Sequence, residues 1–208
     1  MIEHSYHNMY EKYLPLYRDK HFKMLEIGLG CDMGYGPGKS YYAWLEYFPH
    51  VDLYYIEYDA ACAKKWATNT TGATIFAGDQ GDVAFLERFI DETNADTDPF
   101  DIIVDDGGHH MAQQITSLKH LWKALKPGGM YFCEDLQTSY QAYWGGDPTA
   151  VGSNNMMGMV KELLDDLHGF VAQKYDFSTD VLGMDCMREI CAWTKKKASK
   201  VAAGATVP

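Results

Sequence analysis

A long apolar run, an excess of positive charge and an apolar leader are all missing from the sequence. No stretch approaches the roughly 20 apolar residues that span a bilayer, and the first ten residues, MIEHSYHNMY, are polar where a signal peptide would be apolar. Only 18 Lys and Arg face 29 Asp and Glu, which gives a net charge of -11 and a field that repels phosphate backbones. We therefore expect a cytoplasmic protein that binds neither a membrane nor nucleic acid.

The cysteines also lack a recognisable pattern. There are five, an odd number, and they are scattered along the chain with no C-x-x-C pair: Cys31, Cys62, Cys133, Cys186 and Cys191. This spacing argues against a disulfide framework and against a zinc site. We expect neither, which suits a reducing cytosol.

What the sequence does contain is material for a packed core. Hydrophobic residues make up 47% of the 208 residues and aromatic residues 14%, well above the content of a disordered chain. We expect a single domain over residues 1–195, with a short N-terminal helical segment, and a flexible tail over residues 196–208.

Short apolar runs alternate with helical patterns along this domain. Strands are predicted at 23–30, 51–59, 73–79, 100–106, 130–135, 181–187 and 189–195, and helices at 40–47, 60–69, 82–92, 113–125 and 156–168. This alternation predicts an α/β fold: a Rossmann-like, doubly wound and mainly parallel sheet, with an antiparallel last strand that returns through the turn at 187–189. Ligands of such sheets bind beyond the carboxyl ends of the strands, so function is sought there.

Glycines end the first predicted strand in the segment Glu26-Ile27-Gly28-Leu29-Gly30. A dinucleotide fingerprint would need a third glycine where the chain has Met33, and a phosphate-binding P-loop would need its first glycine at the same position. The remaining pattern, E-x-G-x-G, lets a backbone approach a ligand closely without demanding a phosphate, which suits S-adenosylmethionine.

Acidic residues end the next strands and fit the same nucleoside. Glu57 could bind the two ribose hydroxyls and Asp79 the adenine amino group. The alternative is that such glycines only make turns and such acids only cap helices. Because they recur at successive strand ends, we predict a cofactor site formed by Glu26, Gly28, Gly30, Glu57, Asp79, Gln80 and Asp105.

Carboxylates also cluster after the fourth and fifth strands, in Asp105-Asp106-Gly107-Gly108-His109-His110 and in Glu134-Asp135. At adjacent ends of a parallel sheet these acids should converge, and an all-oxygen cluster suits Mg²⁺. We predict Asp106, Glu134 and Asp135 as metal ligands and His109 as general base, with His110 less favoured. The alternative is that these residues cap the following helix or face solvent.

An aromatic group follows in a glycine-rich loop. Tyr140, Tyr143 and Trp144 are surrounded by glycines and polar residues, so we predict that they wall a substrate pocket rather than join the core.

Three segments resemble those of the metal-dependent sugar O-methyltransferases of macrolide biosynthesis, of the mycinamicin and tylosin type, and more distantly the cephalosporin-hydroxylase-like proteins. They are LEIGLG, the turn D-D-G-x-H at 105–109, and LKPGGMYFCEDLQTSY. The resemblance implies the class I methyltransferase fold, with Mg²⁺ on Asp106, Glu134 and Asp135 and with His109 as base. It also implies that Gly28, Glu57 and Asp79 face S-adenosylmethionine. Gly108 stands where the family usually has serine, and we expect no auxiliary N-terminal domain of the kind that the macrolide enzymes carry.

The predicted function is that of an S-adenosylmethionine- and Mg²⁺-dependent O-methyltransferase. Its acceptor would be a hydroxyl of a small molecule, a sugar or glycosylated natural product of secondary metabolism, and the chain could form a homo-oligomer. Two alternatives stay open: a non-catalytic partner or sensor that binds S-adenosylmethionine, and a metal-dependent hydroxylase with iron at the same site. The second is less favoured because iron oxygenases usually present two histidines and one carboxylate.

Overall fold

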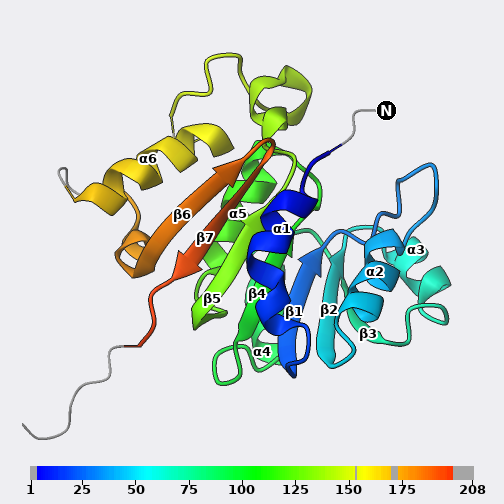
Figure 1. Ribbon diagram of the computed structural model, residues 1–208. Coiled ribbons are helices and arrows are strands. Elements are labelled where there is room, and N and C mark those ends of the chain that lie inside the picture. The colour runs from blue at the N-terminus through cyan, green and yellow to red at the C-terminus, as the bar shows by residue number, and fades with distance from the viewer. Residues whose placement is uncertain (1–3, 153, 170–172, 199–208) are drawn as a thin grey trace, which may run out of the picture.

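A seven-stranded sheet in the order β3-β2-β1-β4-β5-β7-β6 forms the centre of the molecule (Figure 1). The structure is a computed structural model, and it describes residues 4–152, 154–169 and 173–198. Strands β1 to β5 run parallel, and β7 runs antiparallel to both β5 and β6. The strands are β1 (Phe22–Ile27), β2 (Val51–Glu57), β3 (Ala73–Ala77), β4 (Phe100–Asp105), β5 (Leu125–Cys133), β6 (Val181–Met187) and β7 (Ile190–Lys195).

Helices cover both faces of this sheet (Figure 1). One apolar core joins the sheet to the helices α4, α5 and α6, and a second joins it to α1 and α2. The α-helices are α1 (His7–Tyr13), α2 (Lys39–Tyr47), α3 (Ala60–Trp66), α4 (Val83–Glu92), α5 (Met111–Leu121) and α6 (Met156–His168). Short 3₁₀ helices are η1 (Leu14–Tyr17), η2 (Leu136–Tyr140), η3 (Ala142–Trp144) and η4 (Asp176–Asp180). The predicted doubly wound fold with an antiparallel last strand is confirmed.

Several element boundaries differ from the prediction, most clearly the one between α5 and β5. The helix expected over 113–125 spans Met111–Leu121, and β5 already begins at Leu125. Leu125 pairs with Phe100 of β4, whose N–H donates to the Ala124 carbonyl at 2.8 Å. This pairing with the neighbouring strand outweighs the helical spacing of Leu121, Trp122 and Leu125 on which the prediction rested.

The expectation that the cysteines form no disulfides is wrong. Cys31 is bonded to Cys62, and Cys186 is bonded to Cys191, while Cys133 is a free, buried thiol. The first pair joins the loop after β1 to the start of α3, and the second joins β6 to β7 across their hairpin. Disulfide formation requires proximity in space, here 6.0 Å and 4.1 Å between the Cα atoms, and the sequence spacing carried no sign of it.

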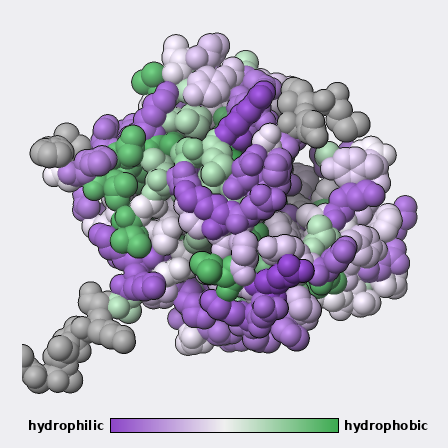
Figure 2. Space-filling view, in the orientation of Figure 1, coloured by the Kyte–Doolittle hydropathy of each residue, from purple (hydrophilic) through white to green (hydrophobic). Residues whose placement is uncertain are grey.

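Hydrophobic side chains are exposed on one side of the molecule. Among the described residues, no helix combines the length and the apolar character needed to cross a membrane. Figure 2 shows hydrophobic surface over the side where α6 and β6 lie, and Leu164 and Leu182 on these elements are 45% and 58% exposed. Of the predicted tail, residues 196–198 have no regular secondary structure and residues 199–208 lie outside the described residues.

Candidate active site

The carboxyl ends of four neighbouring strands place candidate site residues side by side. Ile56, Ile27, Asp105 and Cys133 are paired across β2, β1, β4 and β5. The next residue on each strand is therefore in register too, and these residues are Glu57, Gly28, Asp106 and Glu134. Backbone hydrogen bonds extend the ladder this far: Gly28 N–H donates to Ile56, Asp106 N–H to Ile27, and Glu134 N–H to Asp105. The sheet register alone thus brings a glycine and three acids into one row.

Three side chains in this region converge closely enough to hold a cation. Ligand atoms of Asp106, His109 and Asp135 all lie within 4.8 Å of one another. His109 Nε2 is 3.3 Å from Asp135 Oδ2 and 4.0 Å from Asp106 Oδ1. Both His109 and Asp135 have a left-handed backbone, with φ of 56° and 54°, which is uncommon outside glycine and sharply turns the chain after each strand. The two turns direct the imidazole and the carboxylate toward each other.

Glu134 lies beside this group rather than within it. Its side chain is buried, and its Oε1 accepts a hydrogen bond from the Tyr10 hydroxyl of α1. Asp135 Oδ1 likewise accepts from the Tyr6 hydroxyl at 2.8 Å. No local sequence pattern indicates these contacts, because 124 residues separate Tyr10 from Glu134 and 129 separate Tyr6 from Asp135.

Two neighbouring acids of this region, Glu134 and Asp106, have raised pKa values. Burial is the largest cause that raises the pKa of Glu134 to about 8, and the charges of Glu26 and Asp135 add to it. Burial and the nearby charge of Glu134 also raise the pKa of Asp106 well above its ordinary value. Desolvation and like charge both penalise the carboxylate form, and a bound cation would relieve both. His109 Nδ1 is in addition buried without a hydrogen-bond partner among the residues that the structure describes. The site therefore has the electrostatics of a cation site.

Trp144 shields the histidines from one side. Its ring centroid lies 5.8 Å from that of His109 and 5.1 Å from that of His110. His110 itself is exposed and does not belong to the converging group. Within the described residues that group thus holds one histidine and two carboxylates, so the hydroxylase alternative gains no support from it.

Two of the predicted cofactor residues face the end of β1. Gly28 has φ of 101°, and a Cβ there would lie 2.2 Å from the carbonyl oxygen of Asp106, so only glycine fits. The buried carboxylate of Glu57 accepts from the N–H groups of Leu29, at 2.9 Å, and Asp59, at 2.8 Å. Glu57 therefore fixes the loop between Gly28 and Gly30, and each of its oxygens retains a lone pair for a hydroxyl group.

The carboxylates of Glu26 and Asp79, two other predicted cofactor residues, accept hydrogen bonds from protein donors. Glu26 Oε2 accepts from Ser40 and Trp44 of α2. Asp79 Oδ1 accepts from Gly81 N–H and from the Gln113 side chain.

Gln80 and Asp105 form a buried network behind the strand ends. The Gln80 amide donates to Asp105 at 2.8 Å and accepts from Gly108 N–H at 2.8 Å. Asp105, which is 0% exposed, also accepts from Ser117 and Tyr131. Gln80 and Asp105 therefore hold the turn at 106–109, which carries Asp106 and His109. A direct contact of either side chain with the cofactor stays a prediction.

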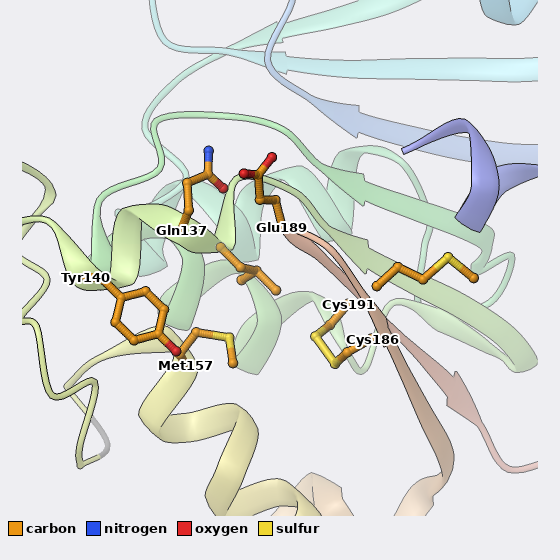
Figure 3. Close-up of a pocket in the computed structure, with 8 residues that line it drawn as sticks. Gln137, Tyr140, Met157, Cys186, Glu189 and Cys191 are labelled. Carbon is orange, nitrogen blue, oxygen red and sulfur yellow. A yellow bond between two sulfur atoms is a disulfide. The ribbon is translucent and has the colours of Figure 1, made fainter. Parts of the chain in front are cut away.

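Two of the three predicted substrate residues are exposed. Tyr143 is 79% exposed and its ring meets Trp144 edge-on at 4.8 Å. Tyr140 lines a pocket of about 250 Å³ between η2, α6 and the β6–β7 hairpin. In Figure 3, Gln137 and Glu189 lie close together at one end of this pocket, while Tyr140, Met157 and the Cys186–Cys191 disulfide flank the other. Gln137 also donates to Asp135, so the pocket adjoins the carboxylate cluster.

Known proteins with similar sequences are O-methyltransferases. The 8-demethyl-8-(2-methoxy-alpha-L-rhamnosyl)-tetracenomycin-C 3'-O-methyltransferase of Streptomyces olivaceus is 34% identical over 170 residues, which are 79% of this chain and 41% of that protein. The mycinamicin VI 2''-O-methyltransferase of Micromonospora griseorubida is 33% identical over 162 residues, 75% of this chain and 38% of that protein. The chain thus spans about two-fifths of the length of these relatives. No family model matches it.

The solved structures agree with this relationship. The MycE methyltransferase from the mycinamycin biosynthetic pathway, solved in complex with Mg, SAH and mycinamycin VI, superposes with a TM-score of 0.82 at 26% identity. The match covers 95% of this chain and 50% of that chain. The resemblance predicted from the three sequence segments is confirmed. The chain has the fold of the class I S-adenosylmethionine methyltransferases, and its sequence is homologous to those of sugar O-methyltransferases of natural-product biosynthesis.

Proposed function

We propose that this chain transfers a methyl group from S-adenosylmethionine to a hydroxyl of a glycosylated small molecule, with the help of Mg²⁺. The observation that carries the proposal is the row of strand ends, in which a ligand-approaching glycine and a carboxylate cluster are adjacent. The relatives support the chemistry, since a rhamnosyl tetracenomycin 3'-O-methyltransferase and a mycinamicin VI 2''-O-methyltransferase are among them.

The residues present fit a hard divalent cation. Asp106 and Asp135 offer oxygen ligands at the converging group, and Glu134 supplies a third carboxylate beside them. Carboxylate oxygens are the donors that Mg²⁺ prefers, and its charge would offset the repulsion that raises the pKa values of Asp106 and Glu134. When bound, such an ion supplies Lewis acidity that lowers the pKa of an acceptor hydroxyl.

The residues also fit the cofactor and the proton transfer. Gly28 keeps the backbone after β1 free of side-chain atoms, and Glu57 is placed to accept hydrogen bonds from ribose hydroxyls. S-adenosylmethionine supplies the methyl group, so the protein has to orient the acceptor and remove its proton. We propose that His109 accepts this proton, because its side chain lies beside Asp135 and contacts the ring of Trp144. Tyr140, Tyr143 and Trp144 would contact the acceptor around it.

Methyl transfer from labelled S-adenosylmethionine to a panel of glycosides tests the proposal. We expect transfer that requires Mg²⁺ and is lost on chelation. Replacing the base in His109→Ala should lower the rate about 10²- to 10⁴-fold, the usual contribution of a general base. Asp106→Asn should abolish the Mg²⁺-dependent transfer because it removes a charged ligand of the ion.

Asp185→Asn is the matched control, because Asp185 is a hydrogen-bonded carboxylate on β6 that accepts from α1 but lies outside the site. It should retain the wild-type rate. Binding of S-adenosylmethionine without transfer to any glycoside, in the presence of Mg²⁺, would instead support the non-catalytic partner or sensor. Absence of cofactor binding would contradict the proposal altogether.

A further inference from the structure

The N-terminal helix reaches the carboxylate cluster with two tyrosines. Tyr6 immediately precedes α1 and Tyr10 lies four residues later, so both side chains project from the same side of the helix. The Tyr10 hydroxyl donates to Glu134 and the Tyr6 hydroxyl donates to Asp135. One helical turn thus contacts two consecutive acids after β5.

Tyr6 contacts Asp135 at two points. Its hydroxyl donates to Asp135 Oδ1 at 2.8 Å and accepts from Asp135 N–H at 3.2 Å. Asp135 has a positive φ of 54°, which a residue with a side chain adopts only when its surroundings hold it there. The single hydroxyl therefore helps to fix both the backbone and the carboxylate of this residue.

Tyr10 is fixed by packing. Its ring centroid lies 5.4 Å from that of Trp44, edge-on, and 5.3 Å from that of Phe132 of β5. The helix itself is held by the buried side chain of Met9, with Leu14 buried just beyond its end. The hydroxyl of Tyr10 therefore has little freedom to leave Glu134.

We propose that Tyr6 and Tyr10 are positioning residues that hold the carboxylates of Asp135 and Glu134 in place for the divalent cation. The inference rests on the proposed function, because it presupposes that cation. Each carboxylate oxygen has two lone-pair sites. Glu134 accepts from Tyr10 through Oε1, and Asp135 accepts from Tyr6 and Gln137 through Oδ1, so the other oxygen of each carboxylate can bind a metal. A neutral donor orients the ligand without adding a positive charge that would compete with the ion. Removing such an outer partner typically weakens metal binding about 10- to 100-fold.

Calorimetric titration of the full chain with Mg²⁺ alone tests the inference on three conservative variants. Tyr6→Phe and Tyr10→Phe each remove one hydroxyl at the site and keep the ring. Tyr13→Phe is the matched control, because Tyr13 also belongs to α1 and donates to a carboxylate, Asp185, at 2.9 Å, but that carboxylate lies outside the site. We expect the Kd for Mg²⁺ to rise at least about tenfold in the first two variants and to stay unchanged in the control.

Thermal unfolding of the same samples separates positioning from general stability. Tyr10→Phe and Tyr13→Phe each lose one hydrogen bond and Tyr6→Phe loses two, so a small fall in Tm is expected for each variant. An unchanged Kd in Tyr6→Phe and Tyr10→Phe would overturn the inference, and so would an equal rise in all three variants. If the wild-type chain binds no Mg²⁺, the metal half of the proposed function fails first and the inference falls with it. That outcome is visible before any variant is measured.

Discussion

At the scale of single residues, Glu26 shows how a buried acid couples stability to pH. This residue is 2% exposed, and its carboxylate accepts from Ser40 and Trp44. Burial raises the pKa of Glu26 from 4.5 to about 7, and the hydrogen bonds from Tyr55, Ser40 and Trp44 lower it by less. Between these two pKa values the folded protein keeps a proton that the unfolded chain has released. The free energy of unfolding must therefore fall as pH rises through this window.

Glu26→Gln should remove this dependence, because glutamine does not titrate and its carbonyl oxygen can still accept from Ser40 and Trp44. A shift from 4.5 to about 7 corresponds to about 3 kcal/mol at about 1.4 kcal/mol per pKa unit. Relative to the wild type, the variant should gain up to that amount of stability across the window. Urea unfolding of both proteins over this pH range measures it, and parallel pH profiles would refute the account.

At the scale of elements, the two disulfides should differ in what they contribute. The Cys31–Cys62 bond closes a loop of 31 residues and Cys186–Cys191 closes one of five. If a disulfide acts by restricting the unfolded chain, the loop-entropy relation gives about 3–4 kcal/mol for the first and about 2 kcal/mol for the second.

Denaturant unfolding of Cys31→Ser/Cys62→Ser and of Cys186→Ser/Cys191→Ser compares these contributions directly. The first double variant should be the less stable. The opposite order would mean that native packing of the β6–β7 hairpin, rather than loop length, determines the effect.

The elements also show what a sequence can and cannot predict here. The acids after β4 and β5 could be placed together because parallel strands end at one edge of the sheet, a property of the fold class alone. The disulfides could not, since Cys31 meets Cys62 only through the packing of a loop against α3. The same holds for Tyr6 and Tyr10, whose partners follow the fifth strand. Contacts between distant segments depend on how α1 packs on the sheet, and no spacing within α1 encodes that.

At the scale of the whole molecule, the candidate cofactor and metal residues occupy different halves of one sheet edge. Glu57 ends β2, and Gly28 and Asp79 follow β1 and β3. Asp106, Glu134 and Asp135 follow β4 and β5 (Figure 1). The two sets meet where Gly28 touches the carbonyl of Asp106, a backbone contact that does not depend on the charge of the carboxylates. Binding of the cofactor should therefore not require the metal.

Calorimetry on two variants tests this separation. Asp135→Asn should lose Mg²⁺ binding and keep its affinity for S-adenosylhomocysteine, whereas Glu57→Gln should lose the cofactor and keep Mg²⁺. Any coupling that does exist must be reciprocal, so a factor by which Mg²⁺ changes the cofactor Kd has to reappear in the Mg²⁺ Kd when the cofactor is bound. Loss of both ligands in either variant would contradict this separation. The carboxyl edge of the sheet would then act as one site, in which the backbone contact between Gly28 and Asp106 couples the affinities for the cofactor and for Mg²⁺.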